Sequence, residues 1–213
     1  MRARNEDDRK QQIRAAAKRC FVKSGYAATR LLDIAKEAGL SKGGVYFHYR
    51  AKEQIFKDIL ENLSTSLEER WTLDALSDQP ADRTLSSLVI AHLETMEDDP
   101  DEVRLHNLLV TMSVRDPGLR RKLEEVTGIM RGLYAQVMAK GIQEGLFTAD
   151  DPEAMAISVL AYINGLGAYT VLDGKARLPI TPRAAAEQVL RMVRSSKRSA
   201  SAVEFGADPP ELN

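Results

Sequence analysis

The stretch GLSKGGVYFHY gathers hydrogen-bond donors and glycines in a short part of the sequence. Lys42, Tyr46 and His48 supply an ammonium, a hydroxyl and an imidazole, and phosphate oxygens accept hydrogen bonds from all three groups. Gly43 and Gly44 lack a Cβ atom, which lets a helix approach another molecule closely. Each glycine also costs about 1 kcal/mol in a helix interior relative to alanine. The combination predicts a short helix whose exposed side contacts a polyanion.

The charge distribution along the chain supports this prediction. The 213-residue chain has a formal net charge of −1. Residues 1–57 contain 14 Lys and Arg against 6 Asp and Glu, a net charge of +8. Residues 58–213 contain 16 Lys and Arg against 25 Asp and Glu, a net charge of −9. A basic segment of this size is typical of a polyanion-binding domain, and a charged surface that contacts only solvent is the alternative.

Three short helical segments are expected to position these residues. The first carries apolar residues at the spacing of an amphipathic helix and ends near Gly25. The second reads LLDIAKEA and ends at Gly39. Ser41 is the expected N-cap of the third, on which Val45 and Tyr49 face inward. This spacing predicts a helix-turn-helix motif, whose second helix enters the DNA major groove.

The remainder of the chain is also predicted to be helical. A fourth helix runs from Lys52 to about Trp71, and Pro80 and Pro100 lie in segments that separate later helices. The helix that begins at Pro152 is apolar on almost every side, so it is expected to be buried on more than one face. The sequence shows no alternating strand pattern and no internal repeat.

The segment GYAATRLLDIAKEAGLSKGGVYFHYRAKEQIF resembles the DNA-binding domain of the TetR/AcrR family of bacterial transcriptional repressors. The resemblance implies an all-α homodimer of about nine helices per chain. Residues 1–51 are expected to form a three-helix helix-turn-helix DNA-binding domain, and residues 52–196 a helical ligand-binding and dimerisation domain. Residues 197–213 are polar, contain Pro and Ser, and are expected to form a disordered tail.

The resemblance also implies which residues contact DNA. Thr29, Tyr46 and Lys52 match family positions that contact phosphates, and His48 falls where an aromatic residue or histidine often does so. The predicted DNA-binding set is Thr29, Arg30, Ser41, Lys42, Gly43, Gly44, Tyr46, His48 and Lys52.

Three positions depart from the family pattern. Arg30 replaces the usual Ser or Thr cap, which loses about 1 kcal/mol of capping and offers a phosphate or base contact instead. Leu32 stands where a polar residue is frequent, so no base contact is predicted for it. Phe47 occupies a variable position. It could contact a thymine methyl group, or its ring could simply be half-exposed.

Two further sets of residues are expected in the second domain. The ligand candidates have side chains that are large, adaptable, or aromatic with a polar end. Any one such residue is more often part of the hydrophobic core than a ligand contact. They are Trp71, His92, Met96, His106, Met112, Met130, Tyr134 and Tyr162. The dimer-interface candidates are small or apolar residues of the last two helices, and an ordinary core helix within one chain is the alternative. They are Ala161, Gly165, Gly167, Ala168, Ala185, Val189 and Met192.

The sequence predicts a DNA-binding transcriptional regulator, most simply a repressor released from a palindromic operator by a small, largely apolar ligand. A ligand-independent architectural DNA-binding protein and a transcriptional activator are the alternatives. Three histidines and one cysteine show no metal-ligand spacing, and no nucleophile or nucleotide motif is present, so neither an enzyme nor a cofactor is expected. Without an 18-residue apolar run or an N-terminal apolar segment, no membrane partner is expected, and a lone Cys20 suits a reducing cytoplasm.

Overall fold

The computed structural model describes residues 2–70, 79–148, 151–172 and 177–194. Nine α-helices account for nearly all of this part of the chain. They are α1 (Arg2–Ser24), α2 (Leu31–Glu37), α3 (Lys42–His48), α4 (Lys52–Arg70), α5 (Ala81–Asp98), α6 (Pro100–Ser113), α7 (Pro117–Gln143), α8 (Pro152–Leu172) and α9 (Pro182–Val193). Among the described residues the only β structure is an isolated antiparallel bridge between Phe147 and Arg194. The predicted all-α fold is confirmed.

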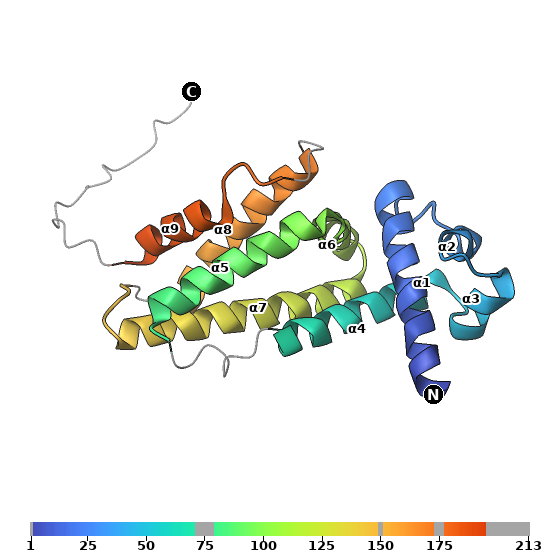
Figure 1. Cartoon of the computed structure of the whole chain (residues 1–213), viewed down its shortest axis with the longest axis horizontal. Helices are drawn as coiled ribbons and strands as arrows, with labels where there is room; N and C mark the ends of the chain where they lie inside the picture. Colours follow the sequence, from blue (N-terminus) through green and yellow to red (C-terminus); the bar gives the residue numbers. More distant parts are fainter. Residues whose placement is uncertain (1, 71–78, 149–150, 173–176, 195–213) are drawn as a thin grey trace, which may run out of the picture.

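The helices form a small head and a longer bundle (Figure 1). The head consists of α1, α2 and α3 at one end of the molecule, and α4 leaves it to run beside α7. The bundle is formed by α5, α7, α8 and α9, with α5 packed on α9 and α7 on α8. Helix α6 contacts both α1 and the bundle helices α7 and α8. The head is therefore joined to the bundle at two places, through α4 and through α6.

Local signals in the sequence set the helix ends. Ser41, Asp116 and Thr181 each accept a backbone hydrogen bond from the first turn of the helix that follows. Gly25 and Gly39 have φ angles of 78° and 64°, in the left-handed region that glycine adopts without a Cβ clash, and they end α1 and α2. The predicted ends of the first two helices and the predicted N-cap of the third are confirmed.

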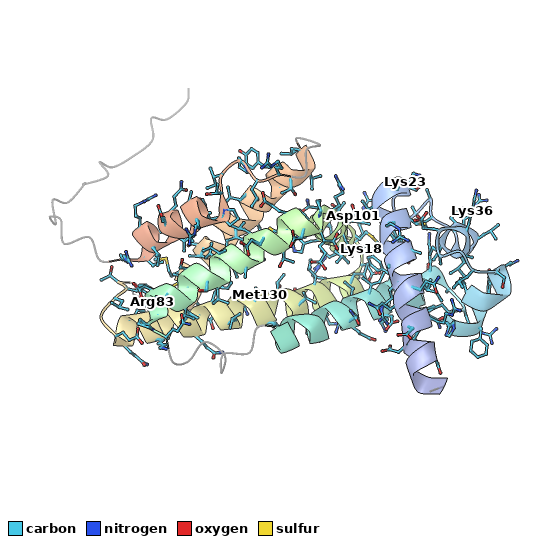
Figure 2. All side chains as sticks on the ribbon, in the orientation of Figure 1. Lys18, Lys23, Lys36, Arg83, Asp101 and Met130 are labelled. Atoms are coloured by element: carbon cyan, nitrogen blue, oxygen red, sulfur yellow. The ribbon has the colours of Figure 1, made fainter. Side chains whose placement is uncertain are left out.

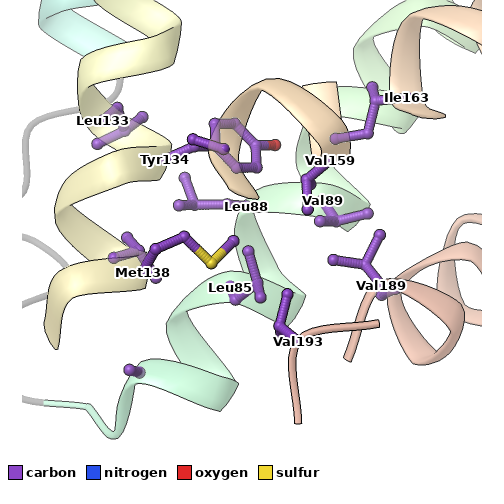
Figure 3. Close-up of a cluster of buried hydrophobic side chains, with 14 of the residues drawn as sticks. Leu85, Leu88, Val89, Leu133, Tyr134, Met138, Val159, Ile163, Val189 and Val193 are labelled. Carbon is purple, nitrogen blue, oxygen red and sulfur yellow. The ribbon is translucent and has the colours of Figure 1, made fainter. Parts of the chain in front are cut away.

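Two clusters of buried side chains stabilise the fold. The head cluster includes Ile13, Phe21, Ile34 and Val45, and it continues into α4 and α6 through side chains such as Phe56. The bundle cluster lies between α5, α7, α8 and α9 (Figure 3). Its labelled members are Leu85, Leu88, Val89, Leu133, Tyr134, Met138, Val159, Ile163, Val189 and Val193. The proposed division at residue 52 stays a prediction, because the head cluster contains residues from both sides of it, and the predicted tail lies outside the described residues.

Helix α8 is apolar enough and long enough to cross a membrane by composition alone, a property that core helices of soluble proteins share. It packs against α5, α6 and α7, yet only 33% of its most apolar window is buried. Its exposed positions recur at helical spacing and form one stripe: Glu153, Ala154, Ile157, Ser158, Ala161, Asn164, Gly165, Tyr169 and Leu172. We call these residues the α8 stripe.

Candidate DNA-binding surface and effector core

The inward side of α3 fixes the orientation of this helix in the head. Val45 and Tyr49 are 0% and 5% exposed, as predicted from their spacing. The Tyr49 hydroxyl donates a hydrogen bond to the carboxylate of Asp58 on α4, and Asp58 lies 3.2 Å from the guanidinium of Arg14 on α1. Burial, and then the Asp58 carboxylate, raise the pKa of Tyr49, so its hydroxyl stays protonated and keeps donating. Helix α3 is therefore attached to both α1 and α4.

The outward side of α3 is open to solvent. Because successive helical residues are about 100° apart, Gly43 and Phe47 lie together on the side opposite Val45. The Phe47 side chain is 78% exposed. Its ring packs edge-on against His48, with centroids 5.0 Å apart and an interplanar angle of 87°. We call Gly43 and Phe47 the α3 ridge.

Polar donors flank the α3 ridge. The Lys42 ammonium is exposed and lies 5.5 Å from the centroid of the half-buried Tyr46 ring. The side-chain oxygen of Ser41 accepts from the Gly44 N–H at 3.1 Å, so this hydroxyl caps the helix. The structure thus brings the predicted residues of α3 to one surface and assigns Ser41 a capping contact.

The structure places Thr29 differently from the prediction. Its side chain is 2% exposed, and the hydroxyl lies 2.8 Å from the carbonyl oxygen of Gly25. A hydroxyl in this position holds the turn between α1 and α2 and does not reach a phosphate. The predicted phosphate contact by the Thr29 side chain is therefore corrected to a structural contact.

Lys52 is also occupied within the protein. Its ammonium donates to the carbonyl oxygens of Tyr26, Ala27 and Thr29 at 2.7, 3.0 and 3.0 Å. It also lies 4.5 Å from the centroid of the Tyr26 ring. An ammonium has three donors, and these carbonyls use all of them. Lys52 links the start of α4 to the turn after α1. The predicted phosphate contact would therefore require Lys52 to give up hydrogen bonds to these carbonyl oxygens.

Arg30 is the exposed N-cap residue of α2, and its guanidinium has no acceptor with which to cap. The lost cap is partly replaced, because the Asp33 carboxylate accepts from the Arg30 backbone N–H at 2.9 Å. The Arg30 side chain forms no cap hydrogen bond and is exposed to solvent.

An ion pair between α1 and the corner of α5 and α6 was not visible in the sequence. The Lys18 ammonium lies 2.5 Å from Asp99 Oδ2 and 3.8 Å from Glu102. Asp99 Oδ1 accepts from the Asp101 N–H at 3.2 Å and so caps α6. Figure 2 shows Lys18 beside the start of α6, where Asp101 lies. The sequence can indicate that an Asp before a proline caps a helix, because that signal is local. It cannot indicate that Asp99 pairs with Lys18, which lies 81 positions away.

Several ligand candidates do come together in the bundle. His92 on α5 and Tyr134 on α7 are adjacent, with His92 Nδ1 3.3 Å from the Tyr134 hydroxyl. Burial, and then the neighbouring His106 of α6, lower the pKa of His92 to about 4, and burial also lowers the pKa of His106. His92 keeps some accessible surface, and its lowered pKa means that the imidazole is uncharged at neutral pH. Met130 belongs to the bundle cluster together with Tyr134, so the polar pair lies at the edge of an apolar cluster.

The other ligand candidates lie elsewhere. Met112 packs against the head cluster, and the Tyr162 hydroxyl contacts Gln188 on the outer side of α8 and α9. Met96 packs against Gly167, where an added Cβ would meet its sulfur at 2.6 Å. Trp71 lies outside the described residues.

The predicted dimer candidates divide between two faces of α8 and α9. Ala161 and Gly165 belong to the α8 stripe, Ala168 is half-buried, and Met192 is 45% exposed. Gly167, Ala185 and Val189 are instead buried in the chain's own bundle. The predicted interface is therefore corrected for these three residues, because a second copy of the chain cannot reach them.

Among the described residues, no group of three or more His, Cys, Asp or Glu side chains has an arrangement suited to a metal ion. Every buried side-chain nitrogen and oxygen in the same part of the chain has a hydrogen-bond partner. The described residues therefore offer a partner molecule hydrogen bonds, apolar contacts and charged groups.

Two family models match this chain. Residues 13–59 match "Bacterial regulatory proteins, tetR family", and residues 81–196 match "BetI-type transcriptional repressor, C-terminal". The chain belongs to the TetR family. TetR-family proteins are transcriptional regulators that bind DNA, and the predicted family, fold and helix-turn-helix motif are confirmed.

Similar proteins agree with this assignment. The chain is 29% identical over 154 residues to the uncharacterized HTH-type transcriptional regulator YfiR of Bacillus subtilis (strain 168), covering 70% of this chain and 73% of that one. Its fold is similar to a transcriptional regulator from Saccharomonospora viridis in complex with choline, with a TM-score of 0.74, 23% identity, and coverage of 89% and 100%. It is also similar to FadR from Bacillus subtilis in complex with stearoyl-CoA, with a TM-score of 0.69, 20% identity, and coverage of 85% and 96%.

Proposed function

We propose that this TetR-family protein is a cytoplasmic homodimeric repressor that leaves a palindromic operator when a small, largely apolar ligand binds in the bundle. The observation that carries the proposal is the separation of two surfaces within one chain. The head presents the α3 ridge and basic side chains outward, whereas the bundle holds the buried Tyr134 beside the partly buried His92. Helices α4 and α6 connect the two.

DNA recognition is assigned to the outward residues of the head. Lys42, Tyr46, His48 and Arg30 supply donors around the α3 ridge, and the +8 charge of residues 1–57 favours association with the phosphate backbone. Thr29 and Lys52 contribute by holding the turn before α2 and the start of α4. The structure thus supports fewer direct phosphate contacts than the sequence predicts.

The homodimer is assigned to the α8 stripe. Glu153 at the first turn is its one charged member, and small residues such as Ala161 and Gly165 allow close approach of a second helix. A second copy covers an exposed apolar stripe with an identical stripe across a two-fold axis, which is the commonest symmetry of soluble oligomers. Two heads related by that axis suit a palindromic operator.

The ligand is assigned to the surroundings of His92 and Tyr134. At neutral pH His92 is uncharged because its pKa is about 4, so the site offers hydrogen bonds and an aromatic face without a formal charge. Such a site suits a molecule that is mostly apolar with a small polar or weakly hydrated group. Choline and stearoyl-CoA are the first probes to use, because two structures of similar fold contain them.

Coupling is assigned to the two connections between head and bundle. A ligand beside His92 lies next to His106 of α6, and α6 is fastened to α1 by the pairing of Lys18 with Asp99. Movement of α6 or of α4 would change the separation of the two α3 helices in the dimer. This assignment requires that the ligand bind the DNA-free state more tightly than the DNA-bound state.

The test is selection from a random-sequence duplex DNA pool, followed by binding measurements on the enriched sequence with choline, stearoyl-CoA and a set of small apolar compounds. The proposal predicts a palindromic sequence bound by one or more dimers and released by at least one compound. Failure to enrich any sequence contradicts operator binding. An operator whose binding no compound alters supports the architectural alternative instead.

A further inference from the structure

We infer that Phe47 reads the C5-methyl group of a pyrimidine in the operator major groove, so that thymine is selected over cytosine at one position in each half-site. The inference rests on the proposed function, since it concerns how the head recognises its DNA. It adds a chemical basis for operator choice that hydrogen-bond donors on α3 do not provide.

No contact among the described residues explains why Phe47 is exposed. Its side chain is 78% exposed and belongs to neither buried cluster. An exposed phenylalanine loses most of the free energy that burial of its ring would contribute. The ring contacts the neighbouring His48 edge-on. A ring that is exposed in the free chain is suited to burial against a partner.

Gly43 indicates where that partner lies. A Cβ atom added to Gly43 would meet only the Ser41 oxygen, at the ordinary contact distance of 3.9 Å. The described structure therefore has room for a side chain here, and no close contact among the described residues requires a glycine. Gly43 and Phe47 share the α3 ridge, so the missing side chain lets a partner approach the ridge that carries the ring.

The charge around the ridge identifies the partner as DNA. Lys42 and Arg50 are exposed beside it, and Arg30 and Lys36 are exposed on α2 and its N-cap, the helix that packs against α3. An exposed apolar ring on a domain with an excess of basic residues suits a polyanion with an apolar feature better than it suits an apolar protein surface. The apolar feature of the major groove is the pyrimidine C5-methyl group. A phenylalanine has neither donor nor acceptor, so it cannot read a base edge by hydrogen bonding.

The experiment uses the full chain and its selected operator duplex. Each thymine is replaced in turn by deoxyuridine, which removes the methyl group and leaves base pairing unchanged. At one position per half-site, loss of the methyl contact is expected to weaken binding about fourfold, and about fifteenfold when both half-sites are changed. Cytosine at that position is expected to bind weakly, and 5-methylcytosine to recover part of the loss.

Variants assign the effect to the ring. Phe47→Ala is expected to bind the thymine and deoxyuridine operators equally, and Phe47→Leu is expected to keep a reduced preference for thymine. Val114→Ala, at a 69% exposed apolar position in the turn between α6 and α7, serves as the matched control and should behave as the unmodified protein. Circular dichroism checks folding, which the exposed position of Phe47 leaves unaffected.

Three results would overturn the inference. One is an operator in which no deoxyuridine replacement changes the affinity of the unmodified protein. Another is undiminished sensitivity in Phe47→Ala. The third is transfer of the effect to Leu32→Ala, since Leu32 is another exposed large apolar residue of the described head, at 59%. Failure to select any operator would instead count against the proposed function itself.

Discussion

Replacement of Lys52 by methionine separates a structural role from a phosphate contact. The three carbonyl oxygens that Lys52 contacts at 2.7 to 3.0 Å belong to the turn after α1, so the variant loses the fastening between that turn and α4. A hydrogen bond to a charged group contributes about 1.5–3 kcal/mol net, and a cation–π contact about 0.5–1 kcal/mol. Because these contacts share one ammonium and part of the turn is exposed, we expect a total loss of about 2–4 kcal/mol.

The assay is chemical denaturation combined with operator binding at several salt concentrations. The unfolding free energy of Lys52→Met should fall by that amount, which corresponds to a melting temperature roughly 10 °C lower. The salt dependence of binding by the folded protein should stay unchanged, because an ammonium occupied by carbonyls does not displace a counterion. A direct phosphate contact would instead reduce the slope by about one unit per contact.

Lys57→Met provides the control, since Lys57 is an exposed lysine on the same helix and should alter stability by less than about 0.5 kcal/mol. Unchanged stability of Lys52→Met together with a reduced salt slope would refute the structural role and restore the phosphate contact.

Three further predictions follow from other parts of the chain. Ala161→Asp places a charge in the α8 stripe, so it should sediment as a monomer and bind the operator weakly. Gln136→Asp, at an exposed position of α7, is the control and should remain dimeric. The pKa of His92 in the folded protein is about 4, below its usual 6.5, so the free energy of unfolding should fall as the pH drops below 6.5. The expected loss at pH 5 is about 2 kcal/mol. Denaturation of the His92→Gln variant should show little of this loss. Lys18→Met should lower the coupling free energy between ligand and DNA binding by about 0.5–2 kcal/mol, measured by ligand titrations with and without DNA. Arg19→Met breaks the 2.6 Å ion pair with Glu37, which joins two helices of the head, and should leave the coupling unchanged.

The sequence predicted the helices well because their signals are local. The cap Ser41 and the left-handed glycines Gly25 and Gly39 act within a few residues, so the pattern alone places these helix ends. The inward positions Val45 and Tyr49 were equally predictable, since their spacing of four residues decides which side of a short helix faces the core.

The site was less predictable where partners come from distant elements. Thr29 and Lys52 have side chains suited to phosphate, but the fold supplies backbone carbonyls first, and only the structure shows these. On α8 the sequence is apolar all round, so no periodicity distinguishes the side that faces the bundle from the side left exposed. Small residues therefore marked two opposite faces, with Gly165 outward and Gly167 against Met96.

The coupling between the bundle and the head is tested most directly by measuring the affinity of a releasing ligand for the free dimer and for the dimer saturated with operator. Thermodynamic reciprocity requires the ligand to bind the operator complex more weakly by the same factor by which it weakens DNA binding, typically about 5–150-fold. We expect these two factors to agree within error. Equal ligand affinities with and without operator would contradict the account, because such a ligand cannot release the protein from DNA.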